Sequence, residues 1–331
     1  MRTSLDWLHE QEHAGVALSL LASLAVSALS VTGALRFPDG VAYDVFVALV
    51  PAREKTTPQV LLLEAGREEM TAGDPVWLRL LSELRRQGAR QIVFGFVPAH
   101  GSQDFFEAAG AGDVVLGRSL AGALAADAET PRPLPLPAAA AGKIFSTAVA
   151  AFAPPQSGVY RYQLVKVALE GGDLPALEVM AARRRHPSGW RAPEQPYLVN
   201  FNEGVDRLPI MRVRQALEGE LVPELVAGRS VLVAPGRESY PVGLDTPGVG
   251  DERPLSPIEF HGYALETLLA GRTIATVPPS GLPLVLALVA LVNFWLYKRA
   301  GLRFAGGVTA ALLAVYALSA YTALGLARVW V

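Results

Sequence analysis

The sequence predicts an α/β domain with a mainly parallel or mixed central sheet, together with three transmembrane helices, one before the domain and two after it. Two observations lead to this prediction. Three uncharged apolar stretches are each long enough for the roughly 20 residues that a helix needs to cross a bilayer. Between the first two stretches, short apolar runs alternate with segments of helical spacing, which is typical of crossover units in a parallel sheet.

The apolar stretches cover residues 14–35, 273–297 and 304–327. Overall composition agrees with a membrane protein, because charged residues make up 18% of the chain, below the roughly 25% of soluble domains. The first stretch is longer than the roughly 7–15 residues of a signal-peptide core. We therefore expect a retained anchor and not a cleaved leader.

The loop between the last two stretches, residues 298–303, contains three basic residues and no acid. Lys and Arg resist translocation, so this loop is expected in the cytoplasm. The N-terminal segment 1–13 is then cytoplasmic as well. The domain at 36–272 and the tail at 328–331 are expected on the opposite side of the membrane.

Within residues 36–272, the clearest helix is the segment 74–88, where Leu80, Leu81 and Leu84 share one face. Asp74 is its candidate N-cap and Gly88 its end. A proline-rich and alanine-rich segment, 127–142, predicts a long surface excursion. Further helices are expected at 104–109, 174–185 and 257–271, and strands at 59–64, 91–97, 113–117, 159–169, 196–201 and 229–235.

Ten segments of the external domain follow one another in a distinctive order. They are YDVF (43–46), PQVLLLEAG (58–66), GARQIVFGF (88–96), DVVLGRS (113–119), GVYRYQLV (158–165), LPALEVM (174–180), YLVNF (197–201), RSVLVAPG (229–236), LDTPG (244–248) and PIEFHGYALETLLAG (257–271). In these segments the chain resembles the type-two CHASE domain (CHASE2), an extracytoplasmic sensor of bacterial receptors. The resemblance implies a multi-pass protein of the bacterial cytoplasmic membrane, with its large domain in the periplasm.

The resemblance also implies acids at the ends of the first two core strands and an Asp-Gly pair before an Arg. This chain has Glu64, Gly95 and Ser157 at those positions. Family members commonly have three helices after the sensor and a cytoplasmic output domain, whereas this sequence has two predicted helices and no output domain. We therefore expect either a sensor that signals through an associated membrane partner or a structural, accessory subunit of a larger complex. A third alternative is a fragment of a longer receptor.

A group of polar residues near the end of the domain is the candidate ligand site. Asp245 and Thr246 lie in the LDTPG segment, Glu259 and His261 open the last helix, and Glu64 ends the first strand. Ligands of open α/β sheets bind outside the carboxyl ends of the strands, so a small-molecule site is expected there. The alternative is purely structural, with Asp245 in a turn and His261 bonded to the backbone.

Inside the membrane, we expect the predicted helices to contact a partner protein as well as the lipid bilayer. Asn293 is a lone amide in the second stretch, and Gly306 and Gly307 allow close helix approach in the third. The partner is another membrane subunit or a second copy of the chain. The alternative is that Asn293 bonds within the protein's own helix bundle.

Several functional classes are not expected. The HEQEH segment places His9, Glu10 and His13 in a zinc-protease pattern, but no third ligand is evident and a polar collar at the membrane surface explains it as well. There are no cysteines, no phosphate loop and no nucleophile elbow, so we expect no metal, no cofactor and no enzymatic activity. A net charge of −2 argues against a nucleic-acid partner.

Overall fold

The structure is a computed structural model of the chain. It describes residues 36–49, 57–72, 75–121, 132–156, 158–169, 172–186, 188–201, 208–247 and 254–276, with a few positions beyond them, namely 291, 295, 307, 311, 314, 318, 322 and 329–330. Its contacts divide the chain into two compact units. Residues 51–274 form one unit, and residues 1–50 and 275–331 form the other.

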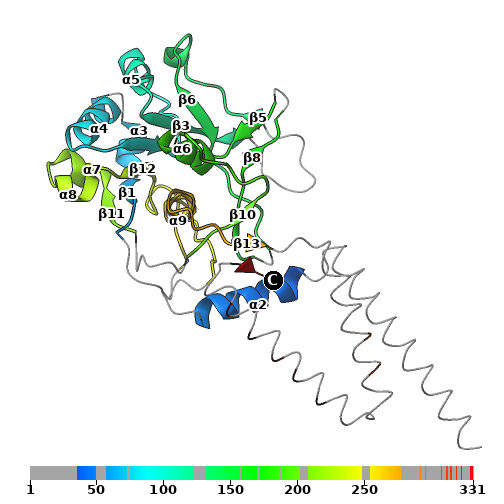
Figure 1. Ribbon diagram of the computed structural model, residues 1–331. Coiled ribbons are helices and arrows are strands. Elements are labelled where there is room, and N and C mark those ends of the chain that lie inside the picture. The colour runs from blue at the N-terminus through cyan, green and yellow to red at the C-terminus, as the bar shows by residue number, and fades with distance from the viewer. Residues whose placement is uncertain are drawn as a thin grey trace, which may run out of the picture. The chain divides into compact units, whose positions relative to one another are not determined.

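The larger unit is built on a six-stranded sheet in which every strand runs parallel to its neighbours (Figure 1). Of the six strands of this sheet, β12 comes last along the chain, yet it lies in the middle of the sheet, between β1 and β2. This arrangement confirms the predicted α/β class. In spatial order the strands are β11 (Ile210–Arg212), β1 (Val60–Ala65), β12 (Ser230–Pro235), β2 (Gln91–Phe94), β3 (Val114–Arg118) and β6 (Ser146–Val149).

Helices cover both faces of this sheet, as a parallel sheet requires. One face packs against α6 (Leu177–Arg185) and α9 (Pro257–Leu269), and the core there includes Leu62, Val93 and Phe260. The other face buries alternate strand residues such as Leu61 and Leu63. On that side lie α3 (Arg67–Thr71), α4 (Pro75–Arg86), α5 (Gln103–Ala109), the 3₁₀ turn η1 (Ala138–Ala140), α7 (Val213–Leu217) and α8 (Pro223–Val226).

Eight of the predicted elements are confirmed to within a few residues, namely the four strands at 59–64, 91–97, 113–117 and 229–235 and the four helices at 74–88, 104–109, 174–185 and 257–271. Some other expectations were wrong. The segments 159–169 and 196–201 form only short strands outside the main sheet, where they pair antiparallel. Two edge strands, β6 and β11, were not predicted. The small pairs are β4 (Leu120–Ala121) with β5 (Arg132–Pro133), β7 (Tyr162–Gln163) with β10 (Tyr197–Leu198), and β8 (Lys166–Val167) with β9 (Leu174–Pro175).

In the second unit, the structure describes helix α2 (Arg36–Leu49) and a parallel pair of two-residue strands, β13 (Ala275–Thr276) and β14 (Val329–Trp330). No helix among the described residues combines the length and the apolar character that crossing a bilayer requires. The expected spans at 14–35, 273–297 and 304–327 lie wholly or largely outside those residues, as does the candidate N-cap Asp74.

Helix α9 is buried on every side, because each residue from Ile258 to Leu269 is buried. Its glycine, Gly262, allows close packing on β1, since a Cβ atom there would lie 2.6 Å from Leu62 Cδ2. At the far end of the helix, Glu266 Oε2 accepts hydrogen bonds from the backbone N–H groups of Gln59 (2.8 Å) and Val60 (3.0 Å). The helix is therefore fixed to the amino end of β1 by hydrogen bonds as well as by apolar packing.

The closest backbone approach in the sheet predicts a sensitive position. A Cβ atom on Gly117 of β3 would lie 2.9 Å from backbone atoms of Phe94 and Gly95. Backbone cannot move aside as a side-chain tip can, so Gly117→Ala should lower the free energy of unfolding by about 1–3 kcal/mol. Urea unfolding of the full chain measures this. Ser82→Ala, at an exposed position of α4, is the control and should change this free energy by less than about 0.5 kcal/mol. Equal effects of the two changes would contradict the packing argument.

Candidate functional site

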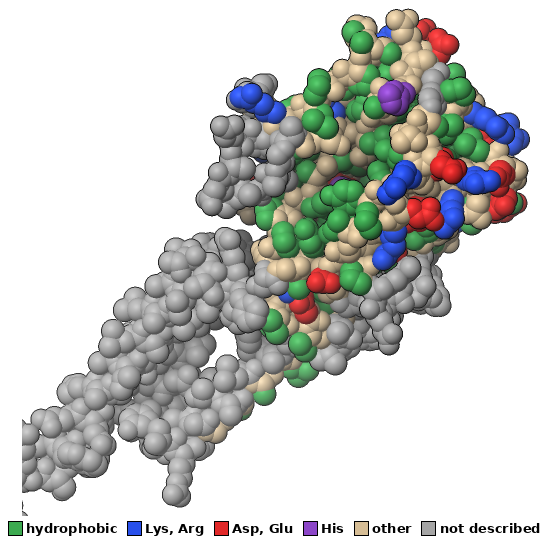
Figure 2. Space-filling model, turned by 180° about the vertical axis from the view of Figure 1, so that it is seen from behind, with side chains coloured by type: hydrophobic (Ala, Val, Ile, Leu, Met, Phe, Trp, Pro, Cys, Tyr) green, Lys and Arg blue, Asp and Glu red, His purple; other side chains and the backbone are tan. Residues whose placement is uncertain are grey.

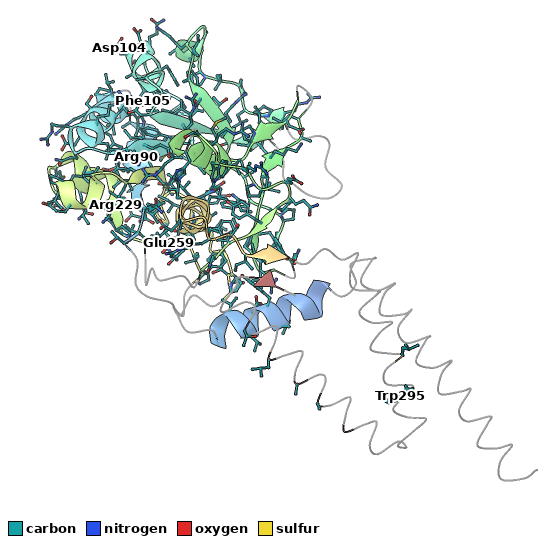
Figure 3. The ribbon with its side chains drawn as sticks, viewed as in Figure 1. Arg90, Asp104, Phe105, Arg229, Glu259 and Trp295 are labelled. Carbon is teal, nitrogen blue, oxygen red and sulfur yellow. The ribbon has the colours of Figure 1, made fainter. Side chains whose placement is uncertain are left out.

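Polar side chains gather at the carboxyl edge of the sheet, where β1, β11 and β12 end. Glu64 pairs in register with Arg212 of β11, and the loop after β12 supplies Arg237 and Glu238. Glu259 lies near the start of α9 and is labelled in Figure 3. We call these five residues the carboxyl-edge cluster. Ligands of open α/β sheets bind at this edge, so it is the candidate site.

Glu259 is the most strongly held acid of the carboxyl-edge cluster. Its Oε2 atom accepts hydrogen bonds from the backbone N–H and the hydroxyl of Ser256, both at 2.7 Å, which closes a capping box at the start of α9. Arg237 Nη2 lies 3.1 Å from the same oxygen. Burial by itself would raise the pKa of Glu259, but these bonds outweigh it and the pKa lies below its ordinary value. Glu259 therefore acts as a buried carboxylate that positions Arg237.

Gly236, in the loop after β12, allows the backbone of that loop to lie close to Glu64. The N–H of Gly236 donates to the carbonyl of Ala65 at 2.9 Å, and a Cβ atom on Gly236 would lie 2.9 Å from Glu64 Cβ. Ser239 Oγ also donates to the Ala65 carbonyl, at 3.0 Å. The loop after β12 is thus folded over the end of β1. Nearby, Arg212 and Glu238 form an exposed ion pair at 2.8 Å, which completes the cluster.

Asp245 and Thr246 lie on a different part of the domain's loops. The carbonyl of Asp245 accepts a hydrogen bond from the N–H of Tyr160 at 2.7 Å, and the two segments form a short parallel bridge. The Asp245 side chain is exposed and Thr246 is half-buried. The backbone of this segment therefore has a structural role, whereas the carboxylate of Asp245 is accessible to solvent.

His261 is buried, with an exposed fraction of 5%, and meets a carboxylate that the sequence analysis did not single out. Its Nδ1 atom is in hydrogen-bond contact with Oε1 of Glu178, which is 1% exposed and lies in the first turn of α6. Phe152 stacks on the imidazole, with ring centroids 4.4 Å apart. We call Glu178 and His261 the buried pair. It joins α6 to α9 on one face of the sheet.

The sequence-predicted residues are thus distributed over three places. Glu64 and Glu259 lie at the carboxyl edge, Asp245 and Thr246 lie on the loop that meets Tyr160, and His261 is in the core. Gly307 is helical and exposed, while Asn293, Gly306, Ser157 and the HEQEH residues His9, Glu10 and His13 lie outside the described residues. Within the part of the chain that the structure describes, no three His, Asp or Glu side chains are grouped to hold a metal ion.

The sequence analysis missed Arg212, Arg237 and Glu238 of the carboxyl-edge cluster and Glu178 of the buried pair. It also missed Gln163, whose Nε2 donates to Glu178 Oε1 at 2.9 Å. One signal was available for Glu178, because it is the only charged residue in the apolar segment LPALEVM at the start of a predicted helix. A buried acid needs a partner, so a search for one could have led to His261. Nothing in the sequence marks Gln163 or Arg237, since their partners come from segments that are distant along the chain or reached only through a loop.

Comparison with known proteins gives one match. A family model described as the CHASE2 domain matches residues 19–296 of the chain. Neither a curated protein nor a solved structure matches it significantly. The family match covers the whole of the carboxyl-edge cluster and the buried pair.

The hydrogen bonds of the Glu259 carboxylate predict that removing its charge will lower the free energy of unfolding. Because the pKa of Glu259 is lowered in the folded state, its contribution to stability is present above about pH 4.3, the pKa of a free glutamate, and is lost as the pH falls through the lower folded value. Glu259→Gln should therefore reduce the free energy of unfolding at pH 7 by about 1–2 kcal/mol, with a smaller difference in acid. Chemical unfolding of the full chain at pH 7 and pH 4 measures both values.

The matched control is Glu238→Gln. Glu238 also pairs with an arginine, but its side chain is 63% exposed. Exposed pairs contribute little, so this change should alter the free energy of unfolding by less than about 0.5 kcal/mol. A loss as large as that of Glu259→Gln would show that exposed charge, and not the capping box, determines the effect.

Proposed function

Because the chain belongs to the CHASE2 domain family, whose members are sensor domains, we propose that it is a membrane-anchored sensor module that recognises a ligand or a protein outside the cytoplasm. The family match over residues 19–296 is the observation that carries this proposal. In this proposal the module acts through an associated membrane protein. Its role is recognition and not catalysis.

The proposal includes a multi-pass location in the bacterial cytoplasmic membrane, with helices at 14–35, 273–297 and 304–327. Two observations support it. These segments are free of charge and long enough to span a bilayer. The described helical positions Leu291, Trp295 and Leu318 expose 66%, 53% and 63% of their large apolar side chains, which suits contact with lipid or another helix. Trp295 is labelled in Figure 3. Asn293, Gly306 and Gly307 are the proposed contacts with a partner or a second copy.

For the stimulus, we place a ligand at the carboxyl-edge cluster. Arg212 and Arg237 offer guanidinium groups to a carboxylate or phosphate, and Glu64 and Glu238 offer carboxylates to a ligand's donors. Asp245 and Thr246, on the separate loop segment that meets Tyr160, remain proposed ligand contacts apart from this cluster. The cluster combines guanidinium and carboxylate groups, so a ligand with groups of both signs suits it better than a nucleic acid. Acidic and basic side chains are also interspersed on the face of the molecule that Figure 2 shows.

One observation favours the second candidate, a structural or accessory subunit of a membrane complex. The family's acid at the end of the second core strand is replaced by Gly95, and a Cβ atom there would lie 2.8 Å from Ala234 Cβ. At the carboxyl ends of β2 and β12, backbone and small side chains are thus packed closely together. In this alternative the domain docks on other subunits and binds no small molecule.

The topology can be tested because the chain has no cysteine. Ser82, exposed on α4, and Ala300, in the loop at 298–303, each become the single thiol of a variant. A maleimide that does not cross the inner membrane should label Ser82→Cys in cells with a permeabilised outer membrane. It should label Ala300→Cys only after the inner membrane is disrupted, and labelling of both before disruption would contradict the proposed topology.

The two candidate functions differ in their response to a change at the carboxyl edge. The full chain is isolated from native membranes in mild detergent, and proteins that accompany it at fixed stoichiometry are identified by mass spectrometry. For a sensor, Arg237→Ala should leave the complex intact and change the activity of its kinase, cyclase or transporter partner about fivefold or more, a typical allosteric coupling. Unchanged activity with an intact complex favours the accessory subunit, and a chain that purifies alone contradicts both.

A further inference from the structure

Arg185, the last residue of α6, is a buried cation whose donors are mostly unpaired. The residue is 9% exposed, and its Nη2 atom donates to the carbonyl of Gly228 at 2.8 Å. Its Nε and Nη1 atoms, which carry three of the five N–H groups of a guanidinium, are buried and have no hydrogen-bond partner among the described residues. An arginine stays protonated in a protein, so the charge remains, and a buried donor without an acceptor is unfavourable.

The polar side chains near Arg185 are committed to other partners. Gln91 donates from Nε2 to a backbone carbonyl of α6 at 2.9 Å, and its Oε1 accepts from the hydroxyl of Ser230 at 3.1 Å. Glu266 Oε2 accepts from two backbone N–H groups at the start of β1. Burial and the charge of Arg90 lower the pKa of Arg185, and the charge of Glu266 only partly offsets them. The guanidinium of Arg185 therefore lacks a matching anion in its surroundings.

Two further arginines come from neighbouring turns at the amino edge of the sheet, where β2 and β12 begin. The N–H of Arg90 donates to the carbonyl of Arg229 at 3.0 Å, and the N–H of Gly228 donates to the carbonyl of Gly88 at 2.9 Å. Arg90 is exposed and Arg229 is half-buried, and both are labelled in Figure 3. Because Arg185 bonds to Gly228, its guanidinium lies at the same turns. We call Arg90, Arg185 and Arg229 the amino-edge arginines.

We propose that the amino-edge arginines form a binding site for a phosphate group. Guanidinium groups bind phosphate well, because several N–H donors meet several anionic oxygens. Glu266 is the acid whose charge acts on Arg185, and it faces three guanidinium groups at this edge. A nearly divalent phosphomonoester offsets this excess of positive charge more fully than a carboxylate does. The site lies at the opposite ends of the strands from the carboxyl-edge cluster and does not depend on the sensor function proposed above.

A bound phosphate would connect three segments that are distant along the chain. Its oxygens would accept from Nε and Nη1 of Arg185, at the end of α6, and from the arginines of the turns before β2 and β12. Because Nε and Nη1 are enclosed, binding must be accompanied by side-chain movement at this edge, for which the long side chains of Arg90 and Arg229 are suited. A ligand that binds only the folded chain stabilises it, so phosphate should oppose unfolding.

The test is urea unfolding of the full chain in phosphorus-free detergent micelles, followed by tryptophan fluorescence. Inorganic phosphate is the probe, and sodium chloride at equal ionic strength is the reference. With a dissociation constant of about 2 mM, about 20 mM phosphate should lower the unfolding equilibrium constant about tenfold. Arg185→Gln and Arg90→Gln should each lose most of this effect. The matched control, Arg183→Gln, removes an exposed arginine from the same last turn of α6 and should keep it.

Phosphate also stabilises proteins in general, because it is excluded from their surface. Equal stabilisation of the wild type and all three variants would reveal this general effect and overturn the site, as would a wild type that phosphate does not stabilise. A second readout does not depend on whether Arg185→Gln folds. The ³¹P resonance of inorganic phosphate should be broader with the wild-type chain than with Arg90→Gln, and equal line widths overturn the site.

A last comparison distinguishes a soluble phosphate from a lipid headgroup as the natural ligand of a site that has passed these tests. The chain is placed in phosphatidylcholine nanodiscs, in phosphate-free buffer, with or without phosphatidic acid, a lipid phosphomonoester. If phosphatidic acid lowers the unfolding equilibrium constant of the wild type but not of Arg90→Gln, the ligand is a headgroup. If it lowers neither, the site takes a soluble phosphate. Failure of the phosphate site leaves the sensor function standing, because that function is tested through Arg237→Ala.

Discussion

The need to cover both faces of a parallel sheet dominates this structure. Among the described helices, α6 and α9 cover one face, and α9 is enclosed so that even its polar residues are buried. Each must then find a partner inside the protein. Glu259 bonds to Ser256 and Arg237, His261 to Glu178, and Glu266 to the backbone at the start of β1. Apolar packing places the helix, and these polar contacts determine its orientation and register.

The two acids of α9 show how strongly position along a helix affects a carboxyl group. Glu259 lies in the first turn, where free N–H groups, a hydroxyl and an arginine outweigh the effect of burial and lower its pKa. Glu266 lies in the last turn, where burial dominates and raises the pKa despite hydrogen bonds from Gln59 and Val60. The carboxyl edge of the sheet therefore holds a stable anion, while the amino edge holds an acid that is costly to ionise.

Helix α9 also connects the features that a sensor needs. Its first turn belongs to the carboxyl-edge cluster, its middle contains His261, and its last turn precedes the segment that leads to residues 273–297. A stimulus can change a protein's state only by binding one conformation more tightly than another. The contacts of α9 with α6 and with the loop at 236–239 hold the helix in its position, so under the proposed sensor function these are the contacts that a bound ligand would have to change.

The sequence by itself determined the α/β class, the strands at the centre of the sheet and the helices α4, α6 and α9, because continuous apolar runs and helical spacing are local properties. It also led to Glu259 and His261. Only the tertiary structure decided that β12 lies between β1 and β2, that the segments 159–169 and 196–201 leave the main sheet, and that Glu178 meets His261. These outcomes depend on contacts between residues that are distant along the chain, such as Ser230 and Gln91, which are 139 positions apart, and no local pattern encodes such contacts.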